Sequence, residues 1–473
     1  MIPSELWTRL WEILSSPPRV EELIARKYPD RLRAYQVEGV QRLIEKERFI
    51  LADEMGVGKT VQVCVALSLL IRLARIKTAL IICPKTVLSV WHEHLKAWLR
   101  EAETHPYSHV HQLRLAQREG RPQVWVVPYS RLAKRGAALT WGSNWDVVVL
   151  DEVHEIRNPD TNKHREIKVV IAHARYRWGL SGTPLQNRIE ELTAIFSVIK
   201  PELKLQADGK PLHQVREIIR PYLRRVRRKD AVPDLPPKQR QEFWLEMDEA
   251  QARAYHAVRN GARTGLGGGR PVTFTHIWQV LTELKKICNF APDSSDSPKL
   301  RKLLEIIEKV VARGEKVVVF SQFRAVGVTA LTHHLNPFGA AVIHGERTDE
   351  ERHQAVRRFQ HDPDCKIFLC TVQTGGHGLT LTAANHVVHF DHWWNPAVSW
   401  QAEDRVCRIG QTRPVTVYDL WMKDTVEERI RKLLEVKGLL HYEVIECLSD
   451  SEFKKLFTLD DLLSLLEDGP LAG

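Results

Sequence analysis

The sequence lacks the features that mark several special classes of protein. No apolar run approaches the roughly 20 residues that a membrane-spanning helix needs, and the opening MIPSELWTRLWE has no basic stretch before an apolar core. The seven cysteines are an odd number without a Cys-x-x-Cys pair, which disfavours a disulfide framework and a structural zinc site. Several cysteines lie within apolar stretches such as ALIICP and KIFLCT, so we expect buried, reduced thiols. These absences argue against a membrane protein and against a secreted, disulfide-rich protein.

What is present is the composition of a folded protein with more than one domain. The chain of 473 residues exceeds a typical domain about threefold, and it has 43% hydrophobic and 27% charged residues. The formal net charge is +10; residues 441–473 hold eight acidic side chains against two lysines, so the rest of the chain carries +16. A basic body favours a polyanionic partner such as nucleic acid, although simple solubility explains the same charge.

Short β-rich runs alternate with helical stretches in two parts of the chain. In residues 32–200 the runs FILAD, TALIICP, VWVVPY and DVVVLDE predict strands that are buried on both faces. A second set follows residue 296 and comprises KVVVFSQF, AAVIHG, CKIFLCT, HVVHFD and PVTVYDL. Such alternation is typical of parallel sheets covered by helices. The sequence therefore predicts an α/β fold with two sheet-containing domains.

The remaining segments divide the chain further. Residues 201–295 are basic and helical, with prolines and the run GLGGG as punctuation. Helical patterns close the chain near 425–437 and 459–467, and another opens it over 5–15. The leucine face of the last helix is expected to pack on its own lobe, with docking of a partner as the alternative. We expect an N-terminal helical segment (1–30), a first lobe (31–200), a helical insertion and interlobe linker (201–295), a second lobe (296–424), and a C-terminal helical brace with an acidic tail (425–473).

The strongest local signal is FILADEMGVGKT at residues 49–60. Gly56 and Gly58 allow backbone N–H groups to turn towards a phosphate, and the helix that Lys59 and Thr60 open favours an anion at its N-terminus. Lys59 is expected to neutralise the β- and γ-phosphates, and the Thr60 hydroxyl to bind Mg²⁺. Asp53 stands where the usual pattern GxxxxGK[ST] has its first glycine. The flanking strand and helix distinguish this segment from a chance glycine-rich turn.

A pair of carboxylates follows another predicted strand, in DVVVLDEVH at 146–154. Asp151 and Glu152 come at the carboxyl end of the strand, where α/β sheets bind ligands. Asp151 is expected to hold Mg²⁺ through water, and Glu152 to orient and deprotonate the attacking water. Alone, such a pair is as often a solvated helix start. Together with the phosphate loop 92 residues earlier, it predicts a nucleoside triphosphatase.

Two more segments carry candidate catalytic groups. In QAEDRVCRIGQ (401–411), the spacing of Arg405 and Arg408 predicts that they share one face of a helix. They are expected to act across an interlobe cleft as arginine fingers, which stabilise charge in phosphoryl transfer, although pairs at this spacing are usually surface ion-pair partners. SGTPLQN (181–187) is expected beside the acidic pair, with Ser181 and Thr183 bonded to a carboxylate. An ordinary Ser/Thr turn is the alternative there.

Eight motifs follow one another along the chain. They are LRAYQVEGV, DEMGVGKT, ICPKTVLSVW, DEVH, SGTPLQN, VVVFSQF, GGHGLTLTAANHVVHFDHWWNP and QAEDRVCRIGQ, and they span about residues 32–440. This ordered set resembles the Swi/Snf-type ATPase family of superfamily-two helicases. The WWNP block, the RIGQ ending and the LRR…LPPK block (223–238) distinguish that family from strand-separating helicases. The resemblance implies two RecA-like lobes that use ATP and Mg²⁺ to translocate along double-stranded DNA without unwinding it.

By position, the resemblance assigns nucleotide contacts to both lobes. Gln36 of the AYQ block is expected to read the adenine. The expected catalytic residues are Lys59, Asp151, Glu152, Arg405 and Arg408, and the expected metal ligands are Thr60 and Asp151. The other expected nucleotide contacts are Asp53, Glu54, Met55, Gly56, Val57, Gly58, Gly378 and Gln401. Val153 departs from the family pattern, which has Ala or Gly at that place.

Nucleic-acid contacts in such motors go mostly to phosphates and carry little sequence information. The candidates by family position are Lys85, Thr86, Arg157, Asn158, Gln186, Asn187, Ser321, Gln322, Arg324, Thr371, Gly375 and Gly376. For each of them a plain structural role is the alternative. The basic run LRRVRRKDAVPDLPPK also fits a nuclear-localisation signal, but we favour a segment that links the lobes, with lining of the DNA groove as a further possibility. Trp393 and Trp394 are expected to pack within the protein, with base stacking as the alternative.

The leading hypothesis is a DNA-dependent ATPase that translocates on double-stranded DNA, as a monomeric motor or as a subunit beside other proteins, without a membrane partner. The alternatives are a strand-separating or RNA-directed helicase, and an ATP-gated DNA clamp or scaffold. The insertion between the lobes is short and no accessory module is visible, which favours a prokaryotic or viral source. The expected location is then the cytoplasm or nucleoid, and the nucleus if the source is eukaryotic.

Overall fold

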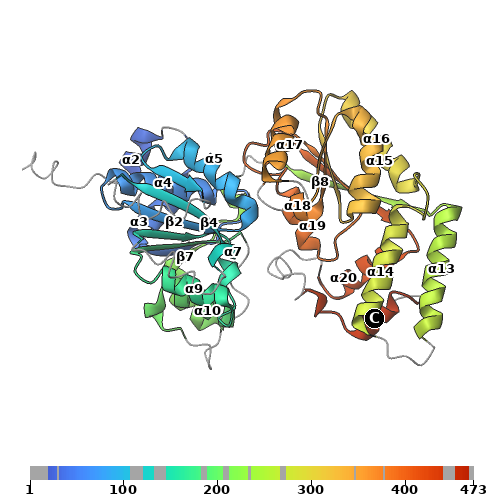
Figure 1. Ribbon diagram of the computed structural model, residues 1–473, viewed down its shortest axis with the longest axis horizontal. Helices are drawn as coiled ribbons and strands as arrows, with labels where there is room; N and C mark the ends of the chain where they lie inside the picture. The colour runs from blue at the N-terminus through green and yellow to red at the C-terminus, as the bar shows by residue number, and fades with distance from the viewer. Residues whose placement is uncertain are drawn as a thin grey trace, which may run out of the picture. The chain divides into compact units, whose positions relative to one another are not determined.

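The computed structural model describes residues 20–28, 31–106, 121–132, 145–182, 189–205, 212–232, 236–266, 273–345, 348–375, 379–439 and 453–467. The chain divides into two compact units, Met1–Ala231 and Val232–Gly473, and each is built on one parallel sheet (Figure 1). The helix that we predicted over residues 5–15 lies outside the described residues. We describe each unit separately.

The sheet of the first unit has the order β3-β4-β2-β5-β6-β1-β7, and its neighbouring strands run parallel. The strands are β1 (Arg48–Leu51), β2 (Thr78–Cys83), β3 (Glu103–Pro106), β4 (Gln123–Pro128), β5 (Val147–Leu150), β6 (Tyr176–Leu180) and β7 (Leu223–Arg224). Because the central strands are covered on both faces, β2 and β5 consist almost entirely of apolar residues, as predicted.

Helices cover both faces of this sheet (Figure 1). One face packs against α2 (Val20–Lys27), α3 (Ala34–Lys46), α4 (Lys59–Arg72) and α5 (Leu88–Trp98). The other packs against α7 (Tyr129–Leu132), the 3₁₀ turn η3 (Val153–Ile156), α9 (Asn162–Val170), α10 (Ile189–Ile199) and α11 (Leu212–Ile219). Alternation along β5 shows the division, because Val147 and Val149 join the first core and Val148 and Leu150 the second.

The second unit has a sheet of order β10-β11-β9-β12-β13-β8, again with parallel neighbours. The strands are β8 (Lys238–Leu245), β9 (Val317–Ser321), β10 (Ala340–Ile343), β11 (Ile367–Thr371), β12 (His386–His389) and β13 (Val415–Met422). One face packs against α15 (Pro298–Ala312) and α16 (Ala330–Leu335). The other packs against α17 (Asp349–His361) and α19 (Pro396–Glu403).

A third core in this unit joins helices from distant parts of the chain. It contains α13 (Glu249–Leu266), α14 (Phe274–Asn289), α20 (Val426–Val436) and α23 (Leu459–Ser464). Leu462, Leu465 and Leu466 of the last helical segment are buried in it, so this segment packs on its own unit, as expected. The predicted brace therefore joins the end of the chain to α14, which comes from the segment between the two predicted lobes.

The predicted α/β fold with two parallel sheets is confirmed. Residues 201–295, however, are not uniformly helical, because they supply β7 to the first sheet and β8 to the second. The sequence KQRQEFWL of β8 is mainly polar, since this strand lies at the edge of its sheet and exposes its first residues. A polar edge strand has no apolar run by which to recognise it.

The expectation of buried, reduced thiols also holds for the described residues. The six cysteines among them, Cys64, Cys83, Cys288, Cys365, Cys370 and Cys407, are buried free thiols. Burial raises the thiol pKa at Cys64, Cys288 and Cys370. None of the helices in these residues combines the length and apolarity that crossing a membrane requires.

Candidate functional site

Three loops of the first unit meet at one edge of its sheet. Strands β5, β6 and β1 are parallel neighbours, so the segments that follow their carboxyl ends lie side by side. These segments begin with Asp151 after β5, Ser181 after β6 and Ala52 after β1. The fold thus brings together the phosphate loop, the acidic pair and the start of the SGT motif, which are separated in the sequence.

The phosphate loop curves around the lysine that ends it. Gly56 and Gly58 have φ angles of 80° and 84°, a left-handed conformation that glycine adopts at low cost. Helix α4 begins at Lys59, and the Nζ of Lys59 donates to the carbonyl oxygens of Asp53 at 2.6 Å and Glu54 at 3.0 Å. The ammonium group therefore lies inside the curve of the loop, where it can neutralise a phosphate.

Gln36 lies against the same loop. Its Nε2 donates to the Val57 carbonyl at 3.2 Å, and its Oε1 accepts from the backbone N–H of Arg33 at 3.0 Å. A Cβ atom at Gly58 would come within 2.5 Å of the Gln36 Nε2, so this close approach requires glycine. The structure places the predicted adenine-reading residue beside the predicted phosphate site.

Asp53, the departure from the usual glycine pattern, does not point its side chain at the loop centre. The side chain is fully buried, and its Oδ1 accepts from the Val226 N–H at 2.9 Å and its Oδ2 from Gln62 Nε2 at 3.3 Å. Burial raises the pKa of this carboxyl group, against the opposing charges of Arg224 and Lys59. Asp53 thus anchors the loop to the residues after β7.

The basic run 223–228 supports the phosphate loop along its length. Next to β1, the N–H groups of Ala52 and Glu54 donate to the carbonyl oxygens of Arg224 and Val226 at 2.7 and 3.0 Å. The Arg228 N–H donates to the Glu54 carboxylate at 2.8 Å. This part of the run is therefore a structural edge of the first unit, a role that we did not predict for it.

The acidic pair occupies a strained turn. Glu152 has a φ of 49°, which is uncommon for a residue with a side chain and is found preferentially at functional sites. The Asp151 carboxylate accepts from Trp91 Nε1 at 2.7 Å, and its main-chain oxygen accepts from the Tyr129 hydroxyl at 2.8 Å. These contacts hold Asp151 in one orientation. Val153 has room because it faces Gly179. A Cβ atom at Gly179 would lie only 3.3 Å from Val153 Cγ2.

The two carboxyl groups of the pair have opposite pKa shifts. Burial, together with the charge of Glu152, raises the pKa of Asp151 to about 6. Burial opposes ionisation of Glu152 as well, but the hydrogen bond and charge of His154 and the charge of Lys59 lower its pKa to about 2. His154 Nδ1 lies 3.4 Å from Glu152 Oε2, and the same contact raises the pKa of His154. Glu152 is therefore ionised at neutral pH and can accept a proton.

Gly182 connects the acidic pair to the phosphate loop. Its N–H faces Glu152 Oε2 at 3.5 Å, and a Cβ at this position would lie 2.6 Å from Met55 Cγ and 3.6 Å from Lys59 Nζ. Lys59, Glu152 and the loop thus surround one small space. Ser181 is buried beside it, whereas Thr183, Gln186 and Asn187 lie outside the described residues.

The donor set fits Mg²⁺ bound together with a nucleotide. In the part of the chain that the structure describes, no three His, Cys, Asp or Glu side chains converge as metal ligands. The protein offers instead one carboxylate, Asp151, and one hydroxyl, Thr60, which follows Lys59 in the first turn of α4. Both are oxygen donors, and Mg²⁺ is commonly held by one or two such groups with phosphates and water completing the coordination.

In the second unit, the expected helical placement of Arg405 and Arg408 is wrong. Helix α19 ends at Glu403, and both arginines lie in the turns that follow. After Glu403 the backbone tightens into a turn, with the Arg405 N–H donating to the Ala402 carbonyl at 3.1 Å, and the Arg405 carbonyl accepts from the Leu381 N–H at 2.9 Å. Arg408 Nη1 donates to the Leu379 carbonyl at 3.2 Å and to Thr380 Oγ1 at 2.9 Å. Gln401 lies on α19, half-buried, and Gly378 lies outside the described residues.

The predicted nucleic-acid contacts of the first unit follow β2 and β5. Lys85 is exposed in the turn η1 (Lys85–Val87), where the side chain of Thr86 is not described. Arg157 is half-buried, with its Nε 4.0 Å from Glu191 Oε1. The Asn158 side chain accepts from the Asp160 N–H at 2.9 Å and shapes the turn before α9.

Those of the second unit follow β9 and β11. Ser321 is fully buried and donates to Asp391, so its side chain has a structural role. Gln322 and Arg324 lie beyond it at the start of the π-helical segment η6 (Arg324–Thr329). The Thr371 hydroxyl bonds to that of Thr374 at 2.7 Å in α18 (Val372–Gly375). The Gly375 surroundings and Gly376 are not described.

Profiles of known protein families match most of this chain. A profile of the SNF2-related domain matches residues 35–292, more than half of the chain. The chain belongs to the SNF2-related family. Within this SNF2-related chain, a profile of the helicase conserved C-terminal domain matches residues 298–410.

Curated SNF2-related proteins resemble the chain over most of its length. A Bacillus subtilis protein named as an ATP-dependent helicase/translocase, YwqA, is 30% identical over 93% of this chain and 52% of its own length. The yeast ISWI chromatin-remodeling complex ATPase ISW1 is 28% identical over 93% of this chain and 43% of its own length. A solved SWI2/SNF2 ATPase core of Sulfolobus solfataricus, in complex with double-stranded DNA, has 26% identity and a TM-score of 0.43, and covers 93% of this chain and 97% of its own. The chain spans about half the length of the curated relatives that it matches.

Two supporting features of this SNF2-related site could not be predicted from the sequence. Trp91 lies within the motif ICPKTVLSVW, but nothing in its pattern indicated a bond to Asp151, 60 residues away. The bracing of the loop by residues 223–228 was hidden because a run of arginines is usually solvent-exposed.

Proposed function

We propose that this chain is a DNA-dependent ATPase that translocates on double-stranded DNA. The observation that carries the proposal is the position of Lys59 within its glycine-containing loop, next to an ionised Glu152 from a neighbouring strand. Membership of the SNF2-related family supports ATP as the nucleotide, as do relatives named for ATP-dependent activity. The YwqA name and the WWNP and RIGQ motifs support translocation.

In this mechanism each residue of the first unit has a distinct role. Backbone N–H groups of the phosphate loop and the Lys59 ammonium bind the β- and γ-phosphates, and Gln36 orients the adenine. Thr60 and Asp151 hold Mg²⁺, which supplies positive charge to the phosphate oxygens when it is bound. Glu152 orients the attacking water and accepts its proton, while His154 holds the Glu152 carboxylate in place. The strained turn at Glu152 keeps this base aimed at the loop.

In this proposal the second unit contributes positive charge to the reaction, and both units contribute nucleic-acid contacts. Arg405 and Arg408 stabilise the charge of the transferring phosphoryl group, on the strength of the motif that they match. Lys85, Arg157, Gln322 and Arg324 are the described candidates whose side chains suit phosphate contact. The lobe boundaries at 31–200 and 296–424, with a linker and a C-terminal brace, belong to the same proposal.

The first test is steady-state ATP hydrolysis without nucleic acid, and with single-stranded DNA, duplex DNA or duplex RNA. We expect stimulation by duplex DNA, and a loss of at least about 10²-fold in the Lys59→Ala variant because phosphate neutralisation is removed. Stimulation mainly by single strands or by RNA would favour an unwinding or RNA-directed helicase instead. Unchanged turnover by Lys59→Ala would overturn the site itself.

The second test is the salt dependence of duplex DNA binding. Since the expected contacts are to phosphates, the logarithm of the binding constant should fall linearly with the logarithm of salt concentration. A binding constant that does not respond to salt would contradict tracking along the phosphate backbone.

A further inference from the structure

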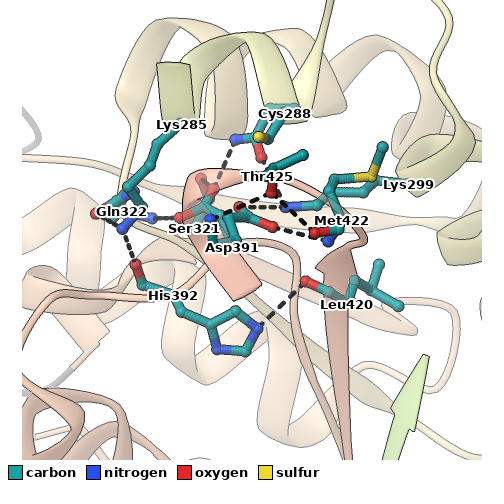
Figure 2. Close-up of polar contacts among 12 residues, drawn as sticks. Lys285, Cys288, Lys299, Ser321, Gln322, Asp391, His392, Leu420, Met422 and Thr425 are labelled. Carbon is teal, nitrogen blue, oxygen red and sulfur yellow. Dashed lines mark hydrogen bonds and ion pairs between the residues drawn. The ribbon is translucent and has the colours of Figure 1, made fainter. Parts of the chain in front are cut away.

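A lysine side chain near the C-terminal end of α14 is buried in the second unit. Lys285 is 2% exposed, and its Nζ donates to the main-chain oxygen of His392 at 2.6 Å and to Gln322 Oε1 at 3.2 Å. Figure 2 shows the side chain reaching from α14 to both residues. The ammonium also lies 4.7 Å from the ring centre of Trp394. Lys285 therefore joins the loop after β9 to the loop after β12.

This lysine has no ion-pair partner among the described residues, since no carboxylate there lies within 4.0 Å of its Nζ. Burying an unpaired charge is costly, so natural proteins seldom do it without a specific role. The charge is instead satisfied by two oxygen acceptors and an aromatic face. Hydrogen bonds from a charged donor are stronger than neutral ones, so Lys285 holds these loops more firmly than an amide or hydroxyl would.

A second contact from α14 holds the same loops one helical turn later. Asn289 Nδ2 donates to Asp391 Oδ2 at 2.7 Å and to the Val326 carbonyl at 3.2 Å. Asp391 is fully buried, and its Oδ1 accepts from the Gln322 N–H at 2.6 Å while Ser321 donates to its Oδ2. Lys285 and Asn289 are four residues apart and therefore share one face of the helix.

The held segment has an irregular backbone. The π-helical segment η6 contains one non-helical residue, Val326, with φ −85° and ψ 23°, and this residue's carbonyl is the one that Asn289 binds. Short π-helical segments occur preferentially at functional sites. Gln322 and Arg324, two of the nucleic-acid candidates, lie at the start of this segment.

We propose that Lys285 is a positioning residue for nucleic-acid recognition, whose positive charge fixes Gln322 and the loop after β12 and so couples nucleic-acid binding to ATP turnover. The coupling part rests on the proposed function. The positioning part stands on the contacts within the second unit alone. The two parts are tested by separate measurements.

The surroundings of Lys285 make its charge sensitive to pH. Burial, together with the nearby charge of Lys299, lowers the pKa of Lys285 from 10.5 to about 8, and Glu427, Asp391 and Cys288 oppose the shift. The cavity of about 220 Å³ that Lys285 lines also contains these charged or titratable groups: Arg240, Glu242, His392, Glu403, Asp419 and Arg431. Between about pH 8 and 10.5 the unfolded chain holds this proton more often than the folded chain, so the contribution of Lys285 to stability rises with pH. Over the same pH range the charged fraction of Lys285 falls, so the positioning by its ammonium group weakens while its contribution to stability rises.

The positioning is measured by hydrogen exchange of the peptides that cover residues 318–330 and 386–398, without nucleotide or nucleic acid. Lys285→Met should raise exchange in both peptides, and Lys285→Arg should restore protection because it keeps a charged donor. Lys286→Met is the matched control, since Lys286 is on the same helix, 40% exposed and paired with Glu283 at 2.9 Å. Unchanged exchange in Lys285→Met would overturn the proposal.

The coupling is measured as the ratio of ATP turnover with duplex DNA to turnover without it. Lys285→Met should lower this ratio by about 10-fold or more, as expected for losing hydrogen bonds from a charged donor. In the unsubstituted protein the ratio should fall as the pH rises above about 8, whereas the contribution of Lys285 itself to the free energy of unfolding rises over the same range. In Lys285→Arg the ratio should remain constant over this range.

The outcomes separate the two proposals. If the unsubstituted protein is not stimulated by any nucleic acid while Lys285→Met exposes both loops, the proposed function and the coupling fail and the positioning holds. If stimulation is normal in Lys285→Met, the coupling is wrong and the function stands. Should Lys285→Met not fold, Lys285→Arg and the pH profile of the unsubstituted protein decide, and a ratio that is constant from pH 7 to 9.5 in both would overturn the coupling.

Discussion

The two sheets present their carboxyl edges in different ways. In the first unit the edge carries partly exposed charged groups, with 24% of the Glu152 side chain and 33% of the His154 side chain accessible. In the second unit the equivalent edge turns its polar groups inward, and Ser321 and Asp391 are fully buried. Both edges follow the same parallel topology, so the topology alone does not decide what an edge does.

The difference shows two uses of the same architecture. The first edge keeps charges accessible and holds them with short contacts from neighbouring loops, as a reactive site requires. At the second edge the polar groups bind one another through Lys285, Asn289 and Asp391. These bonds form a rigid support for the loops that follow the strands. Catalytic changes should therefore dominate at the first edge, and changes in stability and coupling at the second.

The largest effect should be an exception to that division. Arg408→Ala should lower ATP turnover by on the order of 10³-fold while leaving ATP affinity nearly unchanged, because in the proposed function the arginine acts on charge in the transition state. Turnover and nucleotide binding are measured in parallel. Arg413→Ala, on an exposed arginine close in sequence that faces Glu315 at 3.8 Å, serves as the control. A collapse of ATP binding in Arg408→Ala would assign this residue to ground-state binding instead.

At the first edge, Glu152→Gln should lower turnover by about 10²-fold or more, since the amide cannot accept the proton from water. The fold should be retained, because glutamine has the same shape and keeps one acceptor for Gly182. The neighbouring Glu155, which pairs with Lys163, provides the control Glu155→Gln with normal turnover. Equal losses in both variants would point to a general change in local charge.

At the second edge, the buried ion pair of Lys299 and Glu427 should matter for stability. Both side chains are fully buried and their Nζ and Oε1 atoms are 2.7 Å apart. Lys299→Met should lower the free energy of unfolding of the second unit by about 3–5 kcal/mol, because it leaves a buried carboxylate unpaired. Adding Glu427→Gln should recover part of this loss, since glutamine is uncharged and still accepts from the Met422 N–H. Chemical denaturation measures both, and an equal loss in the double variant would contradict the pairing argument.

The smallest effect concerns Asp53, the one buried carboxylate in the phosphate loop. Its pKa is raised in the folded protein, so the folded state binds the proton more tightly and this group's contribution to stability decreases as the pH rises through that range. Asp53→Asn removes the titration and keeps an acceptor for the Val226 N–H. Relative to the unsubstituted protein, the variant should therefore gain stability as the pH rises from about 4 to 7. Unfolding curves of both proteins at the two pH values measure this. An equal difference in the free energy of unfolding at both pH values would contradict a role for Asp53 titration.

The sequence was most informative where burial leaves a strong pattern. Strands such as β5 and β9 are continuous apolar runs, and the phosphate loop combines glycines, a lysine and a helix start. The three loops of the first edge could be expected together because the ends of parallel strands meet. These features follow from local chemistry and from the geometry of parallel sheets.

What could not be predicted depends on contacts between distant residues. After α19 ends, the Arg405 carbonyl binds the backbone N–H of Leu381, a distant contact that no helical periodicity reveals. Lys285 looks like an ordinary surface lysine in the pattern of α14, and its burial becomes apparent only when α14 packs against η6 and its lysine meets the loops after β9 and β12. Ser321 was expected to face nucleic acid, but Asp391 lies 70 residues away and binds it from inside.

The buried thiols offer a practical way to follow each unit separately. Cys64 and Cys83 lie in the first unit and Cys288, Cys370 and Cys407 in the second, all inaccessible to reagents while the units are closed. Burial raises the thiol pKa at Cys64 and Cys288, so alkylation there requires both exposure to solvent and release of the proton. The rate at which an alkylating reagent labels each cysteine therefore reports local unfolding around that cysteine. Mass spectrometry of the labelled peptides would measure local unfolding of both units in one experiment.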